Sequence, residues 1–349
     1  MSALLEGSIK ATHTLIRLLL NPTLTASALA LLAWGPPNLV KKVTDLGFIQ
    51  KYVGTYGLKA ALRVFLGLGL GRAFNRLQNI RASNNWTLLG HNGWSWGDEI
   101  AVITGGCNGI GKATVLGLVQ KGVKVAILDL ADLPPDLAQL NTVSFWKCDV
   151  TSPDAVNKAA DEIRRALGHP SILINNAGLT NRTSILDSSP EQVAKLFEVN
   201  VLSHWHTVKA FLPTMILKNK GHIVTIASIA SFVALSNAVE YSASKAAAQS
   251  FHEGLACEIK HVYKAPGVMT TIVHPMFVNT DMTRSEKKKI EDSSGKMLEP
   301  TDISDSIVKQ IFSCRGAQLI VPSEVSWVSG IRGFPNWLQE TIRDAVAKG

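Results

Sequence analysis

Short apolar runs alternate with helical patterns from Glu99 onward, and this alternation limits the fold more than any other feature of the chain. The runs predict short buried strands. They are Ile100–Thr104, Lys124–Asp129, Val143–Lys147, Ile172–Asn175, His222–Ala227, Val268–His274 and Gln318–Val321. Such alternation implies an α/β fold with a doubly wound parallel sheet and helices on both faces. Few residues, Pro134 and Pro135 among them, separate the second and third runs, so the crossover helix there must be very short.

A glycine-rich loop, Thr104 to Gly111, directly follows the first predicted strand and opens a helix. Glycines let the backbone turn tightly and approach a pyrophosphate, whose charge meets the helix N-terminus. The spacing Gly-x-x-x-Gly-x-Gly differs slightly from the common dinucleotide fingerprint, and an ordinary tight strand–helix turn is the alternative. The predicted cofactor-binding residues of this loop are Gly105, Asn108, Gly109, Ile110 and Gly111.

Asp129 ends the second predicted strand, 18 residues after Gly111. A carboxylate there can accept hydrogen bonds from the adenosine ribose hydroxyls and would repel a 2′-phosphate. Leu130 follows it, so no basic residue takes its place. The pattern favours NAD over NADP as the cofactor. An Asp that only caps the following turn is the alternative.

The segment Tyr241-Ser-Ala-Ser-Lys245 is the strongest local signal of chemistry. A spacing of four places the Tyr and Lys side chains on one helical face. A Tyr hydroxyl has a pKa near 10, and an adjacent ammonium stabilises the phenolate and lowers that pKa. Ser228 lies 13 residues upstream, at the end of a predicted strand, where its hydroxyl could hold a substrate oxygen.

With these motifs in this order, the chain resembles the short-chain dehydrogenase/reductase family over about residues 98–325. The resemblance implies a Rossmann-like fold, NAD or NADP as cofactor, and a catalytic tetrad of Asn200, Ser228, Tyr241 and Lys245. Asn200 matches the family's helix Asn, which holds a water in a proton relay. Lys245 matches the residue that binds the nicotinamide ribose.

Further cofactor-binding positions follow from the same resemblance. Asn176 lies in an Asn-Asn-Ala-Gly motif after the fourth strand, and Asp149 follows the third strand, where the family's Asp contacts adenine. After the sixth strand, many members have Pro-Gly, whereas this chain has Pro-Met-Phe-Val-Asn-Thr. The residues implied in these motifs are Asp149, Val150, Asn176, Pro275, Val278 and Thr280.

This departure, together with an apolar N-terminus, resembles the membrane-associated retinol and 17β-hydroxysteroid dehydrogenase branch of the family. The implied substrate is an apolar alcohol or ketone, such as a retinoid, a steroid or a long-chain lipid. The polar segment from Asp281 to Glu299 contains three consecutive lysines. We expect it to be a mobile substrate lid, and a plain solvated helix is the alternative.

The net charge of +8 lies wholly in residues 1–97, which hold ten Lys and Arg but two acidic residues. The remainder of the chain holds 25 basic and 25 acidic residues. The excess charge therefore lies beside apolar segments, which suits an anionic membrane surface better than nucleic acid. No nucleic-acid partner is expected.

Two apolar stretches occupy this N-terminal region. Leu18–Val40 has no charged residue, but a spanning helix needs about 20 apolar residues, and Pro22, Pro36 and Pro37 lie close to its ends. A single full span there is marginal. The second stretch, Leu58–Leu70, carries two basic residues and suits an interfacial helix or one limb of a re-entrant hairpin.

Other interpretations of the N-terminal region remain. A secretory signal peptide is disfavoured because a small-residue cleavage site is absent. A mitochondrial presequence and a buried helical subdomain packed on the enzyme are the alternatives. We expect a catalytic domain that faces the cytosol at the endoplasmic reticulum or a lipid droplet, with the mitochondrion less favoured.

Cysteine and histidine spacing predicts no metal site. None of the four cysteines forms a Cys-x-x-Cys pair or stands at ligand spacing with a histidine, which fits a reducing compartment. His204, His206 and His274 are expected to be structural.

We therefore expect three parts: an N-terminal membrane-associating extension (1–97), an NAD(P)-binding domain (98–325) and a C-terminal helical tail (326–349). The expected reaction interconverts a lipophilic alcohol and its carbonyl by hydride transfer, with Tyr241 as the general acid or base. The alternatives are an NADPH-linked ketone reductase of lipid or secondary-metabolite synthesis and a low-turnover cofactor-binding scaffold on lipid droplets. A homodimer is a further expectation.

Overall fold

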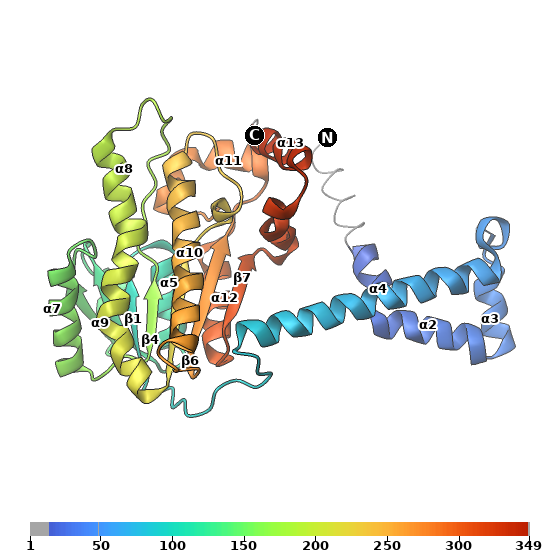
Figure 1. Cartoon of the computed structure of the whole chain (residues 1–349), viewed down its shortest axis with the longest axis horizontal. Helices are drawn as coiled ribbons and strands as arrows, with labels where there is room; N and C mark the ends of the chain where they lie inside the picture. Colours follow the sequence, from blue (N-terminus) through green and yellow to red (C-terminus); the bar gives the residue numbers. More distant parts are fainter. Residues whose placement is uncertain (1–13, 48, 348–349) are drawn as a thin grey trace. The chain divides into compact units, whose positions relative to one another are not determined.

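The computed structural model describes residues 14–47 and 49–347. The chain divides into two compact units, Met1–Ala82 and Ser83–Gly349 (Figure 1). All strands of the described residues lie in the second unit.

Seven parallel strands form one sheet in the second unit, in the order β3-β2-β1-β4-β5-β6-β7. The strands are β1 (Ile100–Thr104), β2 (Lys124–Asp129), β3 (Val143–Lys147), β4 (Ile172–Asn175), β5 (Gly221–Ile226), β6 (Val268–Pro275) and β7 (Ala317–Val321). Each predicted strand is present, with its ends within one residue of the prediction. The prediction of a doubly wound, Rossmann-like sheet is confirmed.

Helices cover both faces of this sheet (Figure 1). The side chains of each strand alternate between the two faces. Ile103 and Ile127 belong to the core on one face, and Val102 and Leu128 to the core on the other. The helices are α5 (Gly109–Val119) and α12 (Pro300–Phe312) on the first face, and α7 (Pro153–Ala166), α9 (Ser203–Lys218) and α10 (Val239–His261) on the second. Both faces are thus buried, as a parallel sheet requires.

The crossover from β2 to β3 contains a single turn of helix, α6 (Pro135–Ala138). Its shortness was expected from the few residues available. On the other side of β1 the chain winds outward through β4, so β1 pairs with both β2 and β4. In open α/β sheets, ligands bind outside the carboxyl ends of the strands at this point of reversal.

Short helices and loops surround these carboxyl ends. They are α8 (Pro190–Phe197), η2 (Glu198–Leu202), η3 (Ile229–Ser231), η4 (Asp281–Glu286) and α11 (Lys287–Ser294). The C-terminal segment follows as η5 (Ser323–Gly333) and α13 (Asn336–Ala347). It packs against the loop after β5, because Val328 and Ile331 share a small apolar core with Phe232 and Val233.

The N-terminal unit is helical in the described residues, with α2 (Pro22–Trp34), α3 (Pro37–Thr44), η1 (Ile49–Val53) and α4 (Gly54–Ser83). The apolar stretch Leu18–Val40 does not form one helix. Asn21 caps the start of α2, and the chain leaves the helix at Gly35 before the two prolines. Since α2 has 13 residues, it is about 20 Å long, which is short of the ~30 Å hydrocarbon core.

The second apolar stretch lies in α4, which is longer than the pattern predicted. No proline interrupts residues 50–83, so helical structure continues to Ser83. Among the described residues, Gln50–Ser83 is the one helix of 34 residues that is long and apolar enough to cross a membrane, and only 6% of its most apolar window is buried. In α4, Gly69 is buried against the Leu20 carbonyl, where an added Cβ would lie 2.6 Å from the oxygen.

Candidate active site

A cavity of about 470 Å³ lies at the carboxyl ends of β1, β4, β5 and β6. Twelve of the residues predicted to bind cofactor or act in catalysis line it. They are Gly105, Asn108, Gly109, Ile110, Asp129, Asn176, Ser228, Tyr241, Lys245, Pro275, Val278 and Thr280. Four of the predicted residues do not line the cavity: Gly111, Asp149, Val150 and Asn200. Of these, Gly111 and Asn200 hold the cavity wall in place.

The glycine loop between β1 and α5 depends on residues without side chains. Gly105 and Gly109 have φ angles of +65° and +53°, which glycine adopts without strain. At Gly111, an added Cβ would lie 2.0 Å from the Gly105 carbonyl oxygen. Asn176 fixes the loop from the side, because its Nδ2 donates to the carbonyls of Thr104 at 3.0 Å and Gly105 at 2.8 Å. The loop therefore brings the N-terminus of α5 to the cavity.

The Asp129 carboxylate stands at the end of β2 beside this loop. Its Oδ2 accepts the Cys107 backbone N–H at 2.9 Å, and its Oδ1 accepts that of Ala131 at 3.0 Å. Burial and the Asp129 charge raise the pKa of the Cys107 thiol to about 12. Cys107 is therefore an unreactive thiol, and the charged group at this end of the cavity is Asp129.

Asp149 lies after β3, outside the cavity lining. Its Oδ1 accepts the Thr151 backbone N–H at 2.9 Å and the Thr151 hydroxyl at 2.7 Å. Lys195 Nζ lies 3.6 Å from Oδ2. Val150 is buried beside it.

Ser228, Tyr241 and Lys245 lie together on the cavity wall. Ser228 ends the segment after β5, where its hydroxyl accepts the Ala230 N–H at 3.1 Å. One turn along α10, Lys245 Nζ lies 5.8 Å from the centroid of the Tyr241 ring. The same ammonium donates to the Ile226 carbonyl at 2.9 Å. The spacing of four residues thus places both groups on one helical face, as predicted.

Burial sets the protonation of this pair. Lys245 is 4% exposed, and burial lowers its pKa to about 8. Burial raises the pKa of Tyr241, while the hydrogen bond from Ser228 and the charge of Arg182 act in the opposite direction. The groups that favour the phenolate in this structure are therefore Ser228 and Arg182.

Asn200 lies behind the cavity wall in the π-helical turn η2, a feature that often occurs at functional sites. Its Nδ2 donates to the Leu179 carbonyl at 2.9 Å and to the Ser244 hydroxyl at 3.0 Å. Its Oδ1 accepts the Leu179 N–H at 2.7 Å. Asn200 thereby ties the loop after β4 to α10, next to Lys245.

The predicted lid segment forms η4 and α11, and its first three residues, Asp281, Met282 and Thr283, line the cavity. Arg182 and Phe277 also line it, and neither was singled out from the sequence. Arg182 stands four residues after the Asn-Asn-Ala-Gly motif, and no local pattern marks it. The apolar part of the lining includes Leu179, Ile229, Leu235, Phe277 and Met282.

Four histidines of the second unit are buried, and within the described residues they form no metal centre. Burial lowers the pKa of His204, His222 and His252 to about 3 and that of His274 to about 4. His274 Nδ1 lies 3.0 Å from the Ser228 carbonyl oxygen. Residues 14–47 and 49–347 contain no group of three or more His, Cys, Asp or Glu placed to hold a metal ion.

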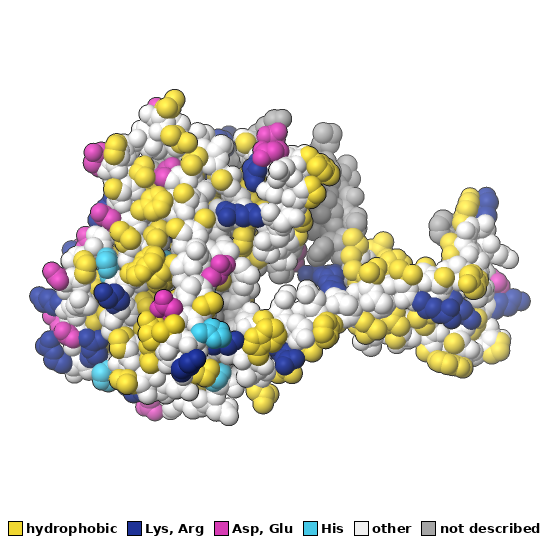
Figure 2. Space-filling view, in the orientation of Figure 1, with side chains coloured by type: hydrophobic (Ala, Val, Ile, Leu, Met, Phe, Trp, Pro, Cys, Tyr) yellow, Lys and Arg dark blue, Asp and Glu magenta, His cyan; other side chains and the backbone are white. Residues whose placement is uncertain are grey.

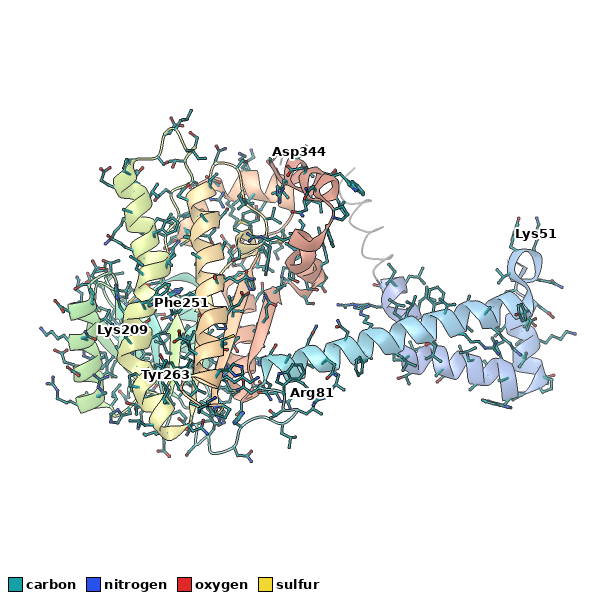
Figure 3. The ribbon with its side chains drawn as sticks, in the orientation of Figure 1. Lys51, Arg81, Lys209, Phe251, Tyr263 and Asp344 are labelled. Atoms are coloured by element: carbon teal, nitrogen blue, oxygen red, sulfur yellow. The ribbon has the colours of Figure 1, made fainter. Side chains whose placement is uncertain are left out.

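A second, open groove of about 1010 Å³ lies on the outer side of α9 and α10. Figure 3 labels Lys209, Phe251 and Tyr263, which line it. None of the predicted site residues lines this groove.

Comparisons with known proteins agree with this geometry. A family model described as short chain dehydrogenase matches residues 99–291. Dehydrogenase RED2 of Cochliobolus heterostrophus is 43% identical over 192 residues, covering 54% of this chain and 71% of the relative. Human estradiol 17-beta-dehydrogenase 11 is 32% identical over 237 residues, covering 66% of this chain and 77% of the relative. Human 17-beta-hydroxysteroid dehydrogenase 13 is 29% identical over 234 residues, covering 65% of this chain and 76% of the relative.

Among solved structures, a short chain dehydrogenase/reductase from Burkholderia phymatum in complex with NAD superposes with a TM-score of 0.60. It is 24% identical and covers 67% of this chain and 92% of that chain. At this identity the likeness supports the fold alone. The resemblance to 17β-hydroxysteroid dehydrogenases, inferred from the motifs, is confirmed by the sequence comparisons.

Proposed function

The chain belongs to the short-chain dehydrogenase family and is an NAD(P)-dependent oxidoreductase acting on CH–OH groups; from this premise we propose that it interconverts a lipophilic alcohol and its carbonyl compound. The observation that carries the proposal is the Ser228–Tyr241–Lys245 group, which stands on the wall of a largely apolar cavity. Two relatives are named for estradiol and for hydroxysteroids. A retinoid, steroid or long-chain lipid substrate is consistent with both.

The residues around the glycine loop fit a dinucleotide cofactor. The backbone at Gly105 and Gly111 leaves no space for a side chain, and the N-terminus of α5 offers the N–H groups that a pyrophosphate accepts. Asp129 would hold the ribose hydroxyls at one end, and Lys245 would hold the nicotinamide ribose at the other. When bound, the cofactor takes up or supplies the hydride of the reaction.

The protein's own part in the reaction is to hold an oxygen and move a proton. We assign Ser228 to hold the substrate oxygen and Tyr241 to exchange the proton with it. Ser228 and Arg182 favour the Tyr241 phenolate, and Lys245, which is cationic below a pKa of about 8, is assigned to hold the nicotinamide ribose. Asn200 positions Lys245 and the loop after β4 through its three hydrogen bonds.

We propose NAD as the preferred cofactor. The Asp129 carboxylate faces the cavity beside the glycine loop, where a 2′-phosphate would meet its negative charge. Leu130 supplies no compensating cation.

We also propose that the N-terminal unit binds a membrane or lipid-droplet surface, with the catalytic unit in the cytosol. Figure 2 shows hydrophobic side chains over much of the visible face of this unit, with Lys and Arg between them. Trp34, Tyr56 and Phe74 are among the exposed ones. Lys51 and Arg81 flank the long helix at its two ends (Figure 3). Apolar helices with basic residues at their ends suit an anionic lipid surface.

The test is a turnover screen of the purified full chain in detergent. Lipophilic alcohols and ketones, with short water-soluble analogues as controls, are assayed with both NAD(H) and NADP(H). We expect turnover of the lipophilic compounds with NAD(H). Preference for NADPH would instead support the ketone-reductase alternative, and no turnover with any pair would contradict the proposal.

A further inference from the structure

Arg182 is the one Arg or Lys other than Lys245 that lines the cavity in the described chain. It lies in the loop after β4 and has a φ of +49°. Its side chain is 22% exposed, and its neighbours in the lining include the apolar Leu179, Phe277 and Met282. A charged group at such a wall requires partners.

Two contacts hold the guanidinium in place. Nη1 forms an ion pair with the Glu286 carboxylate of η4. The Arg182 Cζ lies 5.6 Å from the centroid of the Phe277 ring, a favourable cation–π distance. In residues 14–47 and 49–347, no further hydrogen bond of this guanidinium is formed. Since a guanidinium carries five N–H donors in a planar fork, it retains donors for a ligand in the cavity.

We propose that Arg182 is a specificity-determining residue that binds a second oxygen acceptor of the substrate, a carboxylate or carbonyl close to the carbon that reacts. The inference rests on the proposed function, because it takes the substrate oxygen to lie at Ser228 and Tyr241. Arg is suited to this role, since its fork matches carboxylate and carbonyl oxygens better than a point charge does. The substrate class is then narrower than any apolar alcohol: a long-chain hydroxy acid, its ester, or the matching oxo compound.

The position of Arg182 relative to Tyr241 limits where that acceptor lies. Burial raises the pKa of the Tyr241 hydroxyl, and the Arg182 charge acts in the opposite direction. Charge effects of this kind weaken with distance. Because Arg182 and Tyr241 line the same cavity of about 470 Å³, an oxygen bound by Arg182 lies on the reacting side of the substrate and not at the far end of a long apolar chain.

A purely structural role for Arg182 makes a different prediction. The Arg182–Glu286 pair joins the loop after β4 to η4. If this ion pair only closed the cavity, removing the pair would change kcat/KM by the same factor for every substrate. Recognition of an acceptor instead changes the ratio between substrates that have and lack that acceptor.

The experiment compares three substrates of equal chain length: a 3-hydroxy acid, its methyl ester and the secondary alcohol without a second oxygen. We measure kcat/KM of the full chain with NAD⁺. A charge-assisted hydrogen bond predicts a preference of roughly 10- to 100-fold for the oxygen-bearing substrates. If the acid is preferred over the ester, the ligand is a carboxylate, and equal preference identifies a carbonyl acceptor.

Four variants separate recognition from structure. Arg182→Leu should reduce the preference to about threefold or less, and Arg182→Lys should retain it for the acid better than for the ester. Glu286→Gln should raise the acid-to-ester ratio, because it leaves the Arg182 charge uncompensated. Arg343→Leu, which breaks the Arg343–Glu340 pair on α13, is the matched control and should keep the wild-type ratios.

Equal kcat/KM of the three substrates in the wild type would overturn the inference. So would an Arg182→Leu variant that loses the same factor on all three. Should that variant fail to bind NADH, the Arg182→Lys and Glu286→Gln ratios decide, and wild-type ratios in both would also overturn it. Failure of the proposed function is distinct, because Tyr241→Phe would then retain turnover of the plain alcohol.

Discussion

Replacing Lys245 with Met should abolish turnover and make the cofactor-free protein more stable at pH 7. The Lys245 side chain is 4% exposed, and burial lowers its pKa from 10.5 to about 8. A lowered pKa means that the folded chain binds this proton less tightly than the unfolded chain does. The charged lysine therefore destabilises the folded state, and an apolar side chain of similar length removes that cost.

The size of the effect follows from the pKa. A shift from 10.5 to about 8 corresponds to about 3 kcal/mol at pH 7, where the lysine is charged in both states. The substitution also removes the hydrogen bond to the Ile226 carbonyl, at a cost of about 1 kcal/mol. The net gain in the free energy of unfolding is about 2 kcal/mol, or a rise of several degrees in Tm.

The gain should depend on pH in a defined direction. Between pH 8 and 10.5 the folded lysine is already neutral while the unfolded lysine still binds a proton. Wild-type stability therefore rises with pH through this window. Near pH 10 the remaining cost of the charge falls to about 1 kcal/mol, which the lost hydrogen bond offsets, so the two proteins should be equally stable.

Thermal unfolding of the full chain in detergent, without cofactor, measures the stability difference between Lys245→Met and wild type at pH 7 and pH 10. Lys209→Met, at an exposed position on α9, is the matched control and should show no pH-dependent gain. A Lys245→Met variant less stable than wild type at pH 7 would refute the reasoning. An equal gain at both pH values would refute it too, since the effect would then come from packing and not from charge.

Three further predictions concern the cofactor and the membrane. Asp129→Ala combined with Leu130→Arg should reverse the preference from NAD to NADP in binding titrations, and an unmodified protein that prefers NADP(H) would contradict the role of Asp129. Gly111→Ala places a Cβ 2.0 Å from the Gly105 carbonyl oxygen. NADH binding measured by fluorescence should therefore weaken by about 5- to 150-fold, which corresponds to about 1–3 kcal/mol for an overpacked site; wild-type binding would show that the loop adjusts to the added methyl group. The full chain should stay in the membrane fraction in high salt and leave it only with detergent, because salt screens charge but not apolar burial. A shortened chain that starts at Asn84 should be soluble and should bind cofactor. Release of the full chain by salt alone, or failure of the shortened chain to fold, would count against a membrane anchor.

The strands were predictable because both faces of a parallel sheet are buried, which leaves each strand as an uninterrupted apolar run. Val102 and Ile103 face opposite cores, and both are fully buried. Tyr241 and Lys245 were predictable because helix geometry alone brings residues four apart together. The length of α4 could not be predicted, because the charges at Arg72 and Arg76 end the apolar pattern while the helix itself continues.

Arg182 could not be predicted because its position depends on the path of a loop. A φ of +49° and the pairing with Glu286, 104 residues later, bring it to the cavity. The roles of Gly111 and Asn200 are also hidden in the sequence, because both act from behind the wall through contacts with distant backbone. The resemblance to a family identified their positions, and the structure supplies the physical reason.

The most direct test of the account is the turnover of Tyr241→Phe. The ring and its packing remain, and only the hydroxyl that moves the proton is lost. With the best lipophilic alcohol and NAD⁺, we predict a fall in kcat of about 10²- to 10⁴-fold, while the Kd for NADH measured by fluorescence titration stays at the wild-type value. A variant that retains most of its turnover would contradict the assignment of Tyr241 as the proton-transfer residue.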